Sequence, residues 1–266
     1  MSVLVDKADL SLKYTAHYNE VKQQLFDGSP EILNAQRQSA FQQFVMQGIP
    51  TRKNENYKYT NLNPAFLPKF EFVHKKTESA AEVKDIFRCD VPQLNTNPAL
   101  IYNGWFYKNE NYDLPEGVIL DSLDNIAKEK PELLEKYASL AKVDEDPIVA
   151  LNTAFAKDGF FIYVPKNVVV ENPIQIINLL QSEKDTFSTQ RNFILIEAGA
   201  KIQVLLCDHT LNLNQYLSNS VTEVFAGANA EFEFYTLQNQ HNKATNLNSV
   251  FIEQAKNSEV TTHTAT

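Results

Sequence analysis

The chain has few of the cysteines that cross-link secreted domains, and fewer basic residues than a protein that binds polyanions would need. It has two cysteines in 266 residues, Cys89 and Cys207, which lie far apart and form no Cys-x-x-Cys pair. A disulfide framework is therefore not expected, and a reducing cytoplasm fits best. Lysine and arginine total 24 against 33 acidic residues, a formal charge of -9. Because phosphates are bound by clustered basic side chains, this composition argues against nucleic acids and anionic membranes as partners.

Long apolar segments and common catalytic motifs are missing as well. No stretch approaches the ~20 apolar residues that a membrane-spanning helix requires, and residues 1–14 carry charges where a signal peptide has its apolar core. The chain has no Gly-x-Ser-x-Gly motif, P-loop, dinucleotide-binding glycine fingerprint or His-Glu-x-x-His motif. The sequence therefore predicts a soluble, cytoplasmic protein that is not an enzyme.

What is present suffices for a folded core. Hydrophobic residues make up 43% of the chain and aromatic residues 11%, as in globular proteins. The pattern indicates two regions and an α+β fold. Residues 1–145 are predicted to be helix-rich, and residues 146–266 to consist of short strands.

Two helices are expected at the start of the helix-rich region. Apolar residues recur three and four positions apart at Leu10, Tyr14, Tyr18, Val21 and Leu25. The segment 27–30 breaks this pattern, and Ser29 as N-cap with Pro30 at the first helical position begins a second helix. That helix is expected to end at 48–50, which makes the pair a helical hairpin.

Shorter elements are expected over the rest of this region. The first is a packed loop over 48–62 anchored by Tyr57 and Tyr59, followed by a linker with a short helix over 74–96. A hairpin over 99–107 is expected to turn at Asn103-Gly104. A strand over 117–120 and a helical segment that follows Ser122 and extends to Leu140 complete the region.

The segment Asp146–Leu180 marks the change from helices to strands. A helix-compatible opening is followed by two extended apolar runs, Phe160–Pro165 and Ile174–Leu180. Turn-forming residues at Asp158-Gly159 and Asn172-Pro173 precede these runs. Beyond the segment the chain reads almost entirely as strands.

An internal repeat predicts how these strands are arranged. Ala198-Gly199-Ala200-Lys201 is followed 28 residues later by Ala226-Gly227-Ala228-Asn229 and, after a further 29, by Ala255-Lys256-Asn257-Ser258. A strand pattern precedes and follows each copy. Two strands in each repeat favour a parallel β-helix, or β-solenoid, in which each coil stacks on the previous one. Strands at this spacing also suit a β-sandwich, which is the alternative fold.

The last copy reaches Thr266 with no capping element. Solenoids require caps because an uncovered coil leaves backbone donors and acceptors unpaired. We therefore expect one of two situations. Either the sequence is a fragment, or this end is covered by another chain, which could be a second copy of the same chain.

Three segments together resemble a known family. The runs GIPTRKNENYKYTNL at 48–62, NTAFAKDGFFIYVPKNVVVENPIQI at 152–176 and RNFILIEAGAKIQVLLCDHT at 191–210 are similar to the SufB/SufD family of the SUF iron–sulfur cluster assembly system. The helical segment in front of residue 48 favours the SufD branch.

The resemblance implies an architecture and a role. Family members have an N-terminal helical region, a right-handed parallel β-helix and a C-terminal helical domain, so this sequence would stop within the β-helix. The implied role is that of a non-catalytic scaffold that pairs with SufB-like and SufC-like subunits through the later segments. By the same resemblance, an iron–sulfur cluster would form transiently in the full complex, with no cofactor bound by this segment alone.

Cys207 and His209 are the candidate metal ligands from the residues themselves. At spacing i, i+2 on a strand, both side chains point to the same face, and a thiolate with an imidazole suits a soft metal or a cluster. In the alternative interpretation, Ile202, Val204 and Leu206 face inward and the pair is exposed without a chemical role. Cys89 is interpreted as a structural or incidental cysteine, and His17 and His74 are interpreted as surface residues.

A carbohydrate-active β-helix enzyme is the alternative function, beside another β-solenoid interaction protein. Glu231 with Glu233, or Asp208 near Asp185, would supply the carboxyl pair that glycoside cleavage requires. Alternating charges on a strand are also typical of its solvated face.

Overall fold

The computed structural model describes residues 7–77, 94–109 and 112–266. It opens with the expected helical hairpin, α1 (Lys7–Phe26) and α2 (Glu31–Gln47). The N-cap prediction was wrong by one residue, because the cap of α2 is Pro30 and no side chain caps this end. The hydroxyl of Ser29 instead donates to Asp124 Oδ1 at 3.3 Å and accepts from Lys157 Nζ at 3.3 Å.

The segment 48–62 packs as an irregular loop with one anchor. It contains a short 3₁₀ helix, η1 (Glu55–Tyr57). The hydroxyl of Tyr57 lies 2.9 Å from both carboxylate oxygens of Asp146, whereas Tyr59 is 88% exposed. The prediction of an anchor is therefore confirmed for Tyr57 and wrong for Tyr59.

Helix α3 (Asn63–Phe66) and strand β1 (Glu71–Phe72) follow this loop. The short helix expected within 74–96, and Cys89 with it, falls largely in 78–93, outside the described residues.

The expected hairpin is formed by β2 (Asn97–Tyr102) and β3 (Trp105–Tyr107). Its turn residues Asn103 and Gly104 have φ of 51° and 86°, as a type I′ turn requires. Strand β4 (Ile119–Ser122) leads into α5 (Leu123–Glu129), which Ser122 caps by accepting from Asn125 N. This helix ends at Glu129, earlier than expected, because Pro131 starts the 3₁₀ helix η2 (Pro131–Leu134).

The remaining chain confirms the β-solenoid. After α6 (Pro147–Phe155), the strands are β5 (Phe160–Val164), β6 (Ile174–Leu180), β7 (Thr186–Ile196), β8 (Lys201–Thr210), β9 (Tyr216–Ala226), β10 (Glu231–Asn239), β11 (Ala244–Gln254) and β12 (Glu259–Ala265). They pair in parallel between successive coils, which excludes the sandwich.

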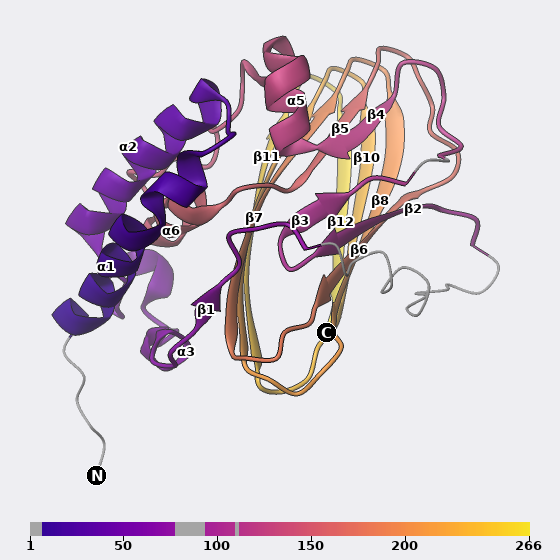
Figure 1. The fold of residues 1–266 in the computed structure, drawn as a ribbon. Helices are drawn as coiled ribbons and strands as arrows, with labels where there is room; N and C mark the ends of the chain where they lie inside the picture. The colour runs from indigo at the N-terminus through magenta and orange to yellow at the C-terminus, as the bar shows by residue number, and fades with distance from the viewer. Residues whose placement is uncertain (1–6, 78–93, 110–111) are drawn as a thin grey trace.

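Two sheets result, and they face each other (Figure 1). Their strand orders are β11-β9-β7-β5-β4, with β1 beside β7, and β12-β10-β8-β6-β2-β3. Helices α1, α2 and α6 lie against the outer face of the sheet that contains β7 (Figure 1). The strands that precede residue 146 belong to both sheets: β1 and β4 to the sheet that contains β7, and β2 and β3 to the other.

Alternation along each strand explains the layers. On β7, Ile194 and Ile196 point into the coil and pack with Val204 and Leu206 of β8. The intervening Phe193 points outward, under α5 and η2. The coil interior and the covered outer face are therefore both apolar. The helical region consequently packs directly on the solenoid.

Candidate functional site

Cys207 and His209 lie on the outer face of β8, as expected from their spacing. Ile202, Val204 and Leu206 pack inside the coil, so that part of the prediction is confirmed. Cys207 is nevertheless fully buried, and His209 is only 9% exposed, which corrects the expectation of an exposed pair. Burial lowers the pKa of His209. The thiol of Cys207 lies 3.8 Å from Gln175 Nε2.

A ligand role for Cys207 and His209 remains a prediction. Within 7–77, 94–109 and 112–266, no group of three or more histidine, cysteine and acidic side chains is arranged to hold a metal ion. A metal on these two residues would therefore need further ligands from elsewhere.

The carboxylates considered for carbohydrate cleavage have partners. Glu231 pairs with Lys201 Nζ at 2.5 Å, and Glu233 accepts from Gln203 Nε2 at 3.1 Å. Asp208 points into the coil, where Asn178 and Asn246 donate to it at 2.7 and 3.0 Å. Burial raises the pKa of Asp208, while Asp185 accepts from the backbone of Gln215 at 2.8 Å. These contacts are those of structural side chains.

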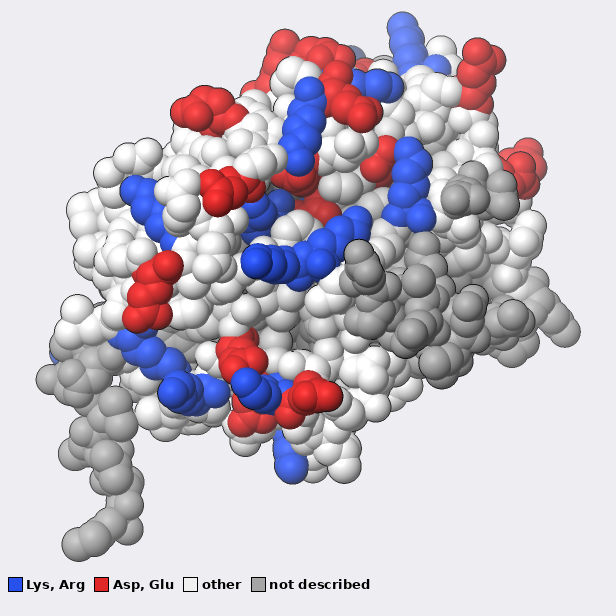
Figure 2. Space-filling model, in the orientation of Figure 1, with Lys and Arg blue, Asp and Glu red and all other residues white. Residues whose placement is uncertain are grey.

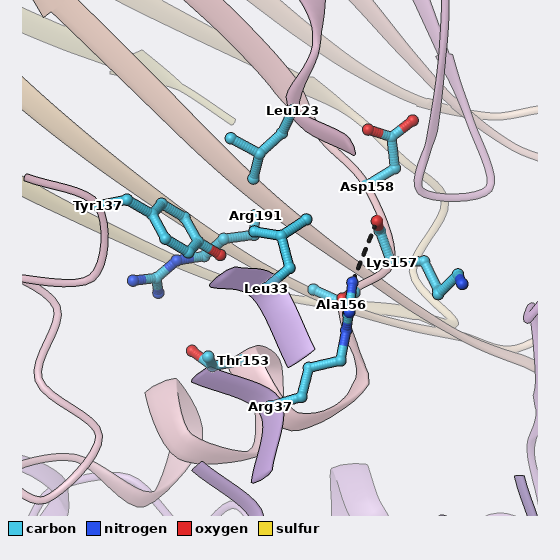
Figure 3. A pocket seen from close by; sticks show the side chains of 9 residues that line it. All are labelled: Leu33, Arg37, Leu123, Tyr137, Thr153, Ala156, Lys157, Asp158 and Arg191. Atoms are coloured by element: carbon cyan, nitrogen blue, oxygen red, sulfur yellow. Dashed lines mark hydrogen bonds between the residues drawn. The ribbon is translucent and has the colours of Figure 1, made fainter. Parts of the chain in front are cut away.

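A buried polar cluster joins the helices to the sheet that contains β7. It surrounds a narrow pocket between α2, α6 and the sheet (Figure 3). Arg37 of α2 donates from Nε to Ala156 O at 2.9 Å and from Nη2 to Lys157 O at 3.4 Å. Lys157 in turn donates to Leu25 O at the end of α1 at 3.0 Å. The segment after α6 is thus held to both N-terminal helices.

Asp158 lies at the opposite side of this cluster, and its carboxylate points away from Arg37 (Figure 3). It accepts from Ser122 Oγ at 2.7 Å and from Phe106 N at 3.1 Å. Burial raises the pKa of Asp158 to about 6, against the opposing effect of these hydrogen bonds. Asp158 therefore ties the β2–β3 hairpin and β4 to the first coil.

Arg191 and Glu223 complete the cluster with a fully buried ion pair, Nη2 to Oε2, at 2.8 Å. The guanidinium also lies over the ring of Tyr137, with 5.4 Å between Cζ and the ring centroid. Neither residue was singled out in the sequence. A usable signal was available, since the two charges are 32 residues apart, about one repeat, in strands that contain no other charged residue.

A second pair, His17 and His74, was also missed. Their Nε2 atoms are 3.1 Å apart, and both rings are half-buried. The interpretation as surface residues therefore holds only in part, because each ring is partly exposed and the contact between them was not predicted. The two residues are 57 positions apart, and no local pattern joins them.

Charges on the face shown in Figure 2 are mixed. Figure 2 shows Lys and Arg interspersed with Asp and Glu on the viewed face, among uncharged side chains. No helix within the described ranges is both long and apolar enough to span a membrane.

Comparison with known proteins agrees with this architecture. Residues 8–176 match the family model of the SufBD protein N-terminal region, and residues 178–266 match that of the SUF system FeS cluster assembly SufBD core domain. Similar curated proteins are iron–sulfur cluster assembly SufBD family proteins of Staphylococcus aureus (strain MRSA252) and Staphylococcus haemolyticus (strain JCSC1435), each 31% identical over 144 residues.

Each of these alignments covers 53% of this chain and 31% of the relative, so the chain matches less than a third of either relative's length. The two family models, in contrast, follow one another along the chain, over the helices with the first strands and then over the remaining coils. On the strength of these consecutive matches, the chain belongs to the SufBD family.

Proposed function

We propose that the chain is the N-terminal portion of a SufD-like scaffold subunit that takes part in iron–sulfur cluster assembly. The observation that carries the proposal is the pair of consecutive family matches on one fold, a helical region fastened to a parallel β-solenoid. The helical hairpin in front of residue 48 supports the SufD branch.

The solenoid supplies the property that a scaffold requires, which is rigidity. Strands β7 and β9 pair over eleven successive positions from Thr186↔Tyr216 to Ile196↔Ala226, and β9 with β11 over the same length. Such long, in-register pairing resists bending because many backbone hydrogen bonds must break together. A stiff rod of this kind holds partner subunits at a fixed separation.

The partners that we propose are SufB-like and SufC-like subunits. A parallel sheet grows by backbone hydrogen bonds to one more strand, which is a recurring way for two chains to join. The iron–sulfur cluster is cargo of the whole complex in this proposal, and we assign no described residue to it. We further propose a cytoplasmic location, in keeping with two widely separated cysteines.

We propose that the subunit performs no catalytic turnover of its own. The support is that the carboxylates weighed for catalysis are engaged in structural contacts, as Glu231 with Lys201 and Asp208 with Asn178 and Asn246.

Cluster reconstitution tests this function. The full-length protein that contains this chain would be mixed with SufB-like and SufC-like subunits, iron, a sulfide source and ATP, and cluster formation followed by visible absorption. We expect cluster yield to rise with this subunit present, and the subunit alone to hydrolyse no ATP. Equal yield without the subunit, or turnover of ATP or polysaccharide by the subunit alone, would refute the proposal.

A further inference from the structure

The His17–His74 pair is held in place by aromatic rings. The His17 imidazole stacks on Phe72 with centroids 3.8 Å apart and planes at 27°, and it lies nearly parallel to Phe155 at 6.1 Å. The His74 ring is almost parallel to Phe72 at 5.9 Å. Rings packed in this way keep their nitrogens in position before any ligand arrives. The packing of the rings therefore holds the two Nε2 atoms next to each other.

The contact with Glu20 favours the tautomer of His17 that has its lone pair on Nε2. Glu20 Oε2 lies 3.5 Å from His17 Nδ1, and a carboxylate at this nitrogen keeps the proton on Nδ1. Burial lowers the pKa of His17 although Glu20 opposes this shift, and burial is also the main cause that lowers the pKa of His74 to about 4; the site itself rests on the ring geometry. Neutral imidazole is the form that binds metal ions.

The positive charge of Lys157 acts on His74, and this ammonium is already engaged. Its ammonium donates to the carbonyls of Leu25 and Asp27, both at 3.0 Å. These contacts hold the ammonium at the end of α1, so its charge weakens the site without occupying it.

The separation of the nitrogens matches that of two ligands on one ion. With metal–nitrogen distances of about 2.0–2.1 Å, adjacent ligand nitrogens lie roughly 2.9–3.4 Å apart in square and tetrahedral geometries. The observed 3.1 Å lies within this span. Without a metal the same distance suits a hydrogen bond between the rings. Loading would require the shared proton to leave Nε2 while that imidazole takes one up at Nδ1, so that the ring stays neutral, and both rings to tilt until their lone pairs point at the ion. His17 is 26% exposed, which leaves solvent access to the ion.

We propose that His17 and His74 form a two-histidine site for a divalent first-row transition ion such as Zn²⁺, with water completing its coordination. The bound ion would link α1 to the segment that follows β1. It would thereby fasten the helical hairpin to the sheet that contains β7. This inference does not depend on the proposed function.

Zinc binding by the untagged full chain tests the site. We would titrate Zn²⁺ by calorimetry into wild type, His17→Gln, His74→Gln and the control His263→Gln. His263 is an exposed histidine on β12. We expect one ion per chain, at least tenfold weaker binding in both site variants, and unchanged binding in the control.

A measurement on wild type alone keeps the proposal falsifiable if a variant fails to fold. Side-chain NMR of the histidines should show Zn²⁺-dependent shifts at Nε2 of His17 and His74 and none at His263. No zinc binding at 100 µM Zn²⁺, equal affinity in the site variants, or shifts confined to the other histidines would overturn the site in favour of a plain ring–ring hydrogen bond.

Discussion

Arg191 Nη2 lies 2.8 Å from Glu223 Oε2, and both side chains are fully buried between the solenoid and its helical cover. The same carboxylate accepts backbone N–H groups from Ala138 at 2.9 Å, Leu140 at 2.8 Å and Ala141 at 2.9 Å. Glu223 therefore binds the segment between η2 and α6 to the sheet that contains β7. The ion pair itself links β7 to β9 within this sheet, whereas the three backbone hydrogen bonds to Glu223 connect the sheet to the segment that covers it.

Replacing Glu223 with alanine should lower the free energy of unfolding by about 3–5 kcal/mol, because it leaves the Arg191 charge buried and unpaired. Glu223→Gln, which keeps one acceptor oxygen, should lower it less. Urea denaturation followed by circular dichroism measures both values. Glu253→Ala is the control, since Glu253 pairs with Lys136 in solvent at 3.4 Å. A loss no larger than that of the control would contradict the role of Glu223.

Asp158 should make stability fall as pH rises from about 4 to about 6. Burial raises its folded pKa to about 6 from 3.8, so the folded state binds more protons in this window and is favoured at its acidic end. At 1.36 kcal/mol per pKa unit, the effect reaches roughly 3 kcal/mol. Asp158→Asn, which cannot ionise, should lack this component.

The check is the difference between the stability curves of wild type and Asp158→Asn from pH 4 to 7. Other titrating groups contribute equally to both curves and cancel. A constant difference across the window would contradict the raised pKa and show that the hydrogen bonds from Ser122 and Phe106 balance the effect of burial at Asp158.

Gly159→Ala should prevent the first coil from closing. A Cβ at this position would lie 1.9 Å from the backbone oxygen of Arg191, a clash with main chain that cannot move aside. Gly28→Ala is the matched control, because its Cβ meets nothing within 4 Å and only φ of +67° disfavours alanine, by about 1–2 kcal/mol. Thermal unfolding should show a much larger loss for Gly159→Ala, and equal losses would be inconsistent with this packing.

Cys207→Ser should leave cluster assembly by the full complex unchanged. Cys207 is fully buried on β8, where a cysteine serves as a small apolar side chain. The measurement is cluster yield in the reconstitution described above, with complex formation checked by gel filtration. A clear loss of yield in an intact complex would support the ligand role predicted for Cys207 and His209.

Local patterns predicted much of the fold. The Asn103-Gly104 turn needs only its own backbone, and the alanine-rich turns at 198, 226 and 255 repeat with the period of one coil. Both features can therefore be recognised in a single sequence. The N-cap of α2 was not predicted correctly, because the hydroxyl of Ser29 forms hydrogen bonds with Asp124 and Lys157 from distant segments.

The polar sites escaped prediction for the same physical reason. His17 meets His74 only because β1 pairs with β7 and brings the segment after it against α1. The burial of Cys207 likewise depends on what covers the outer face of β8, and strand alternation alone predicts exposure there. Contacts between elements remote in sequence decide both cases.

The most direct test of the scaffold proposal is native mass spectrometry of complexes co-purified from cells. The full-length protein that contains this chain would carry an affinity tag and be co-expressed with untagged SufB-like and SufC-like subunits. The account predicts a stable assembly that contains all three subunits, and its loss when Gly159→Ala disrupts the first coil while Gly28→Ala leaves it intact. Recovery of the tagged, folded protein without either partner would contradict the account.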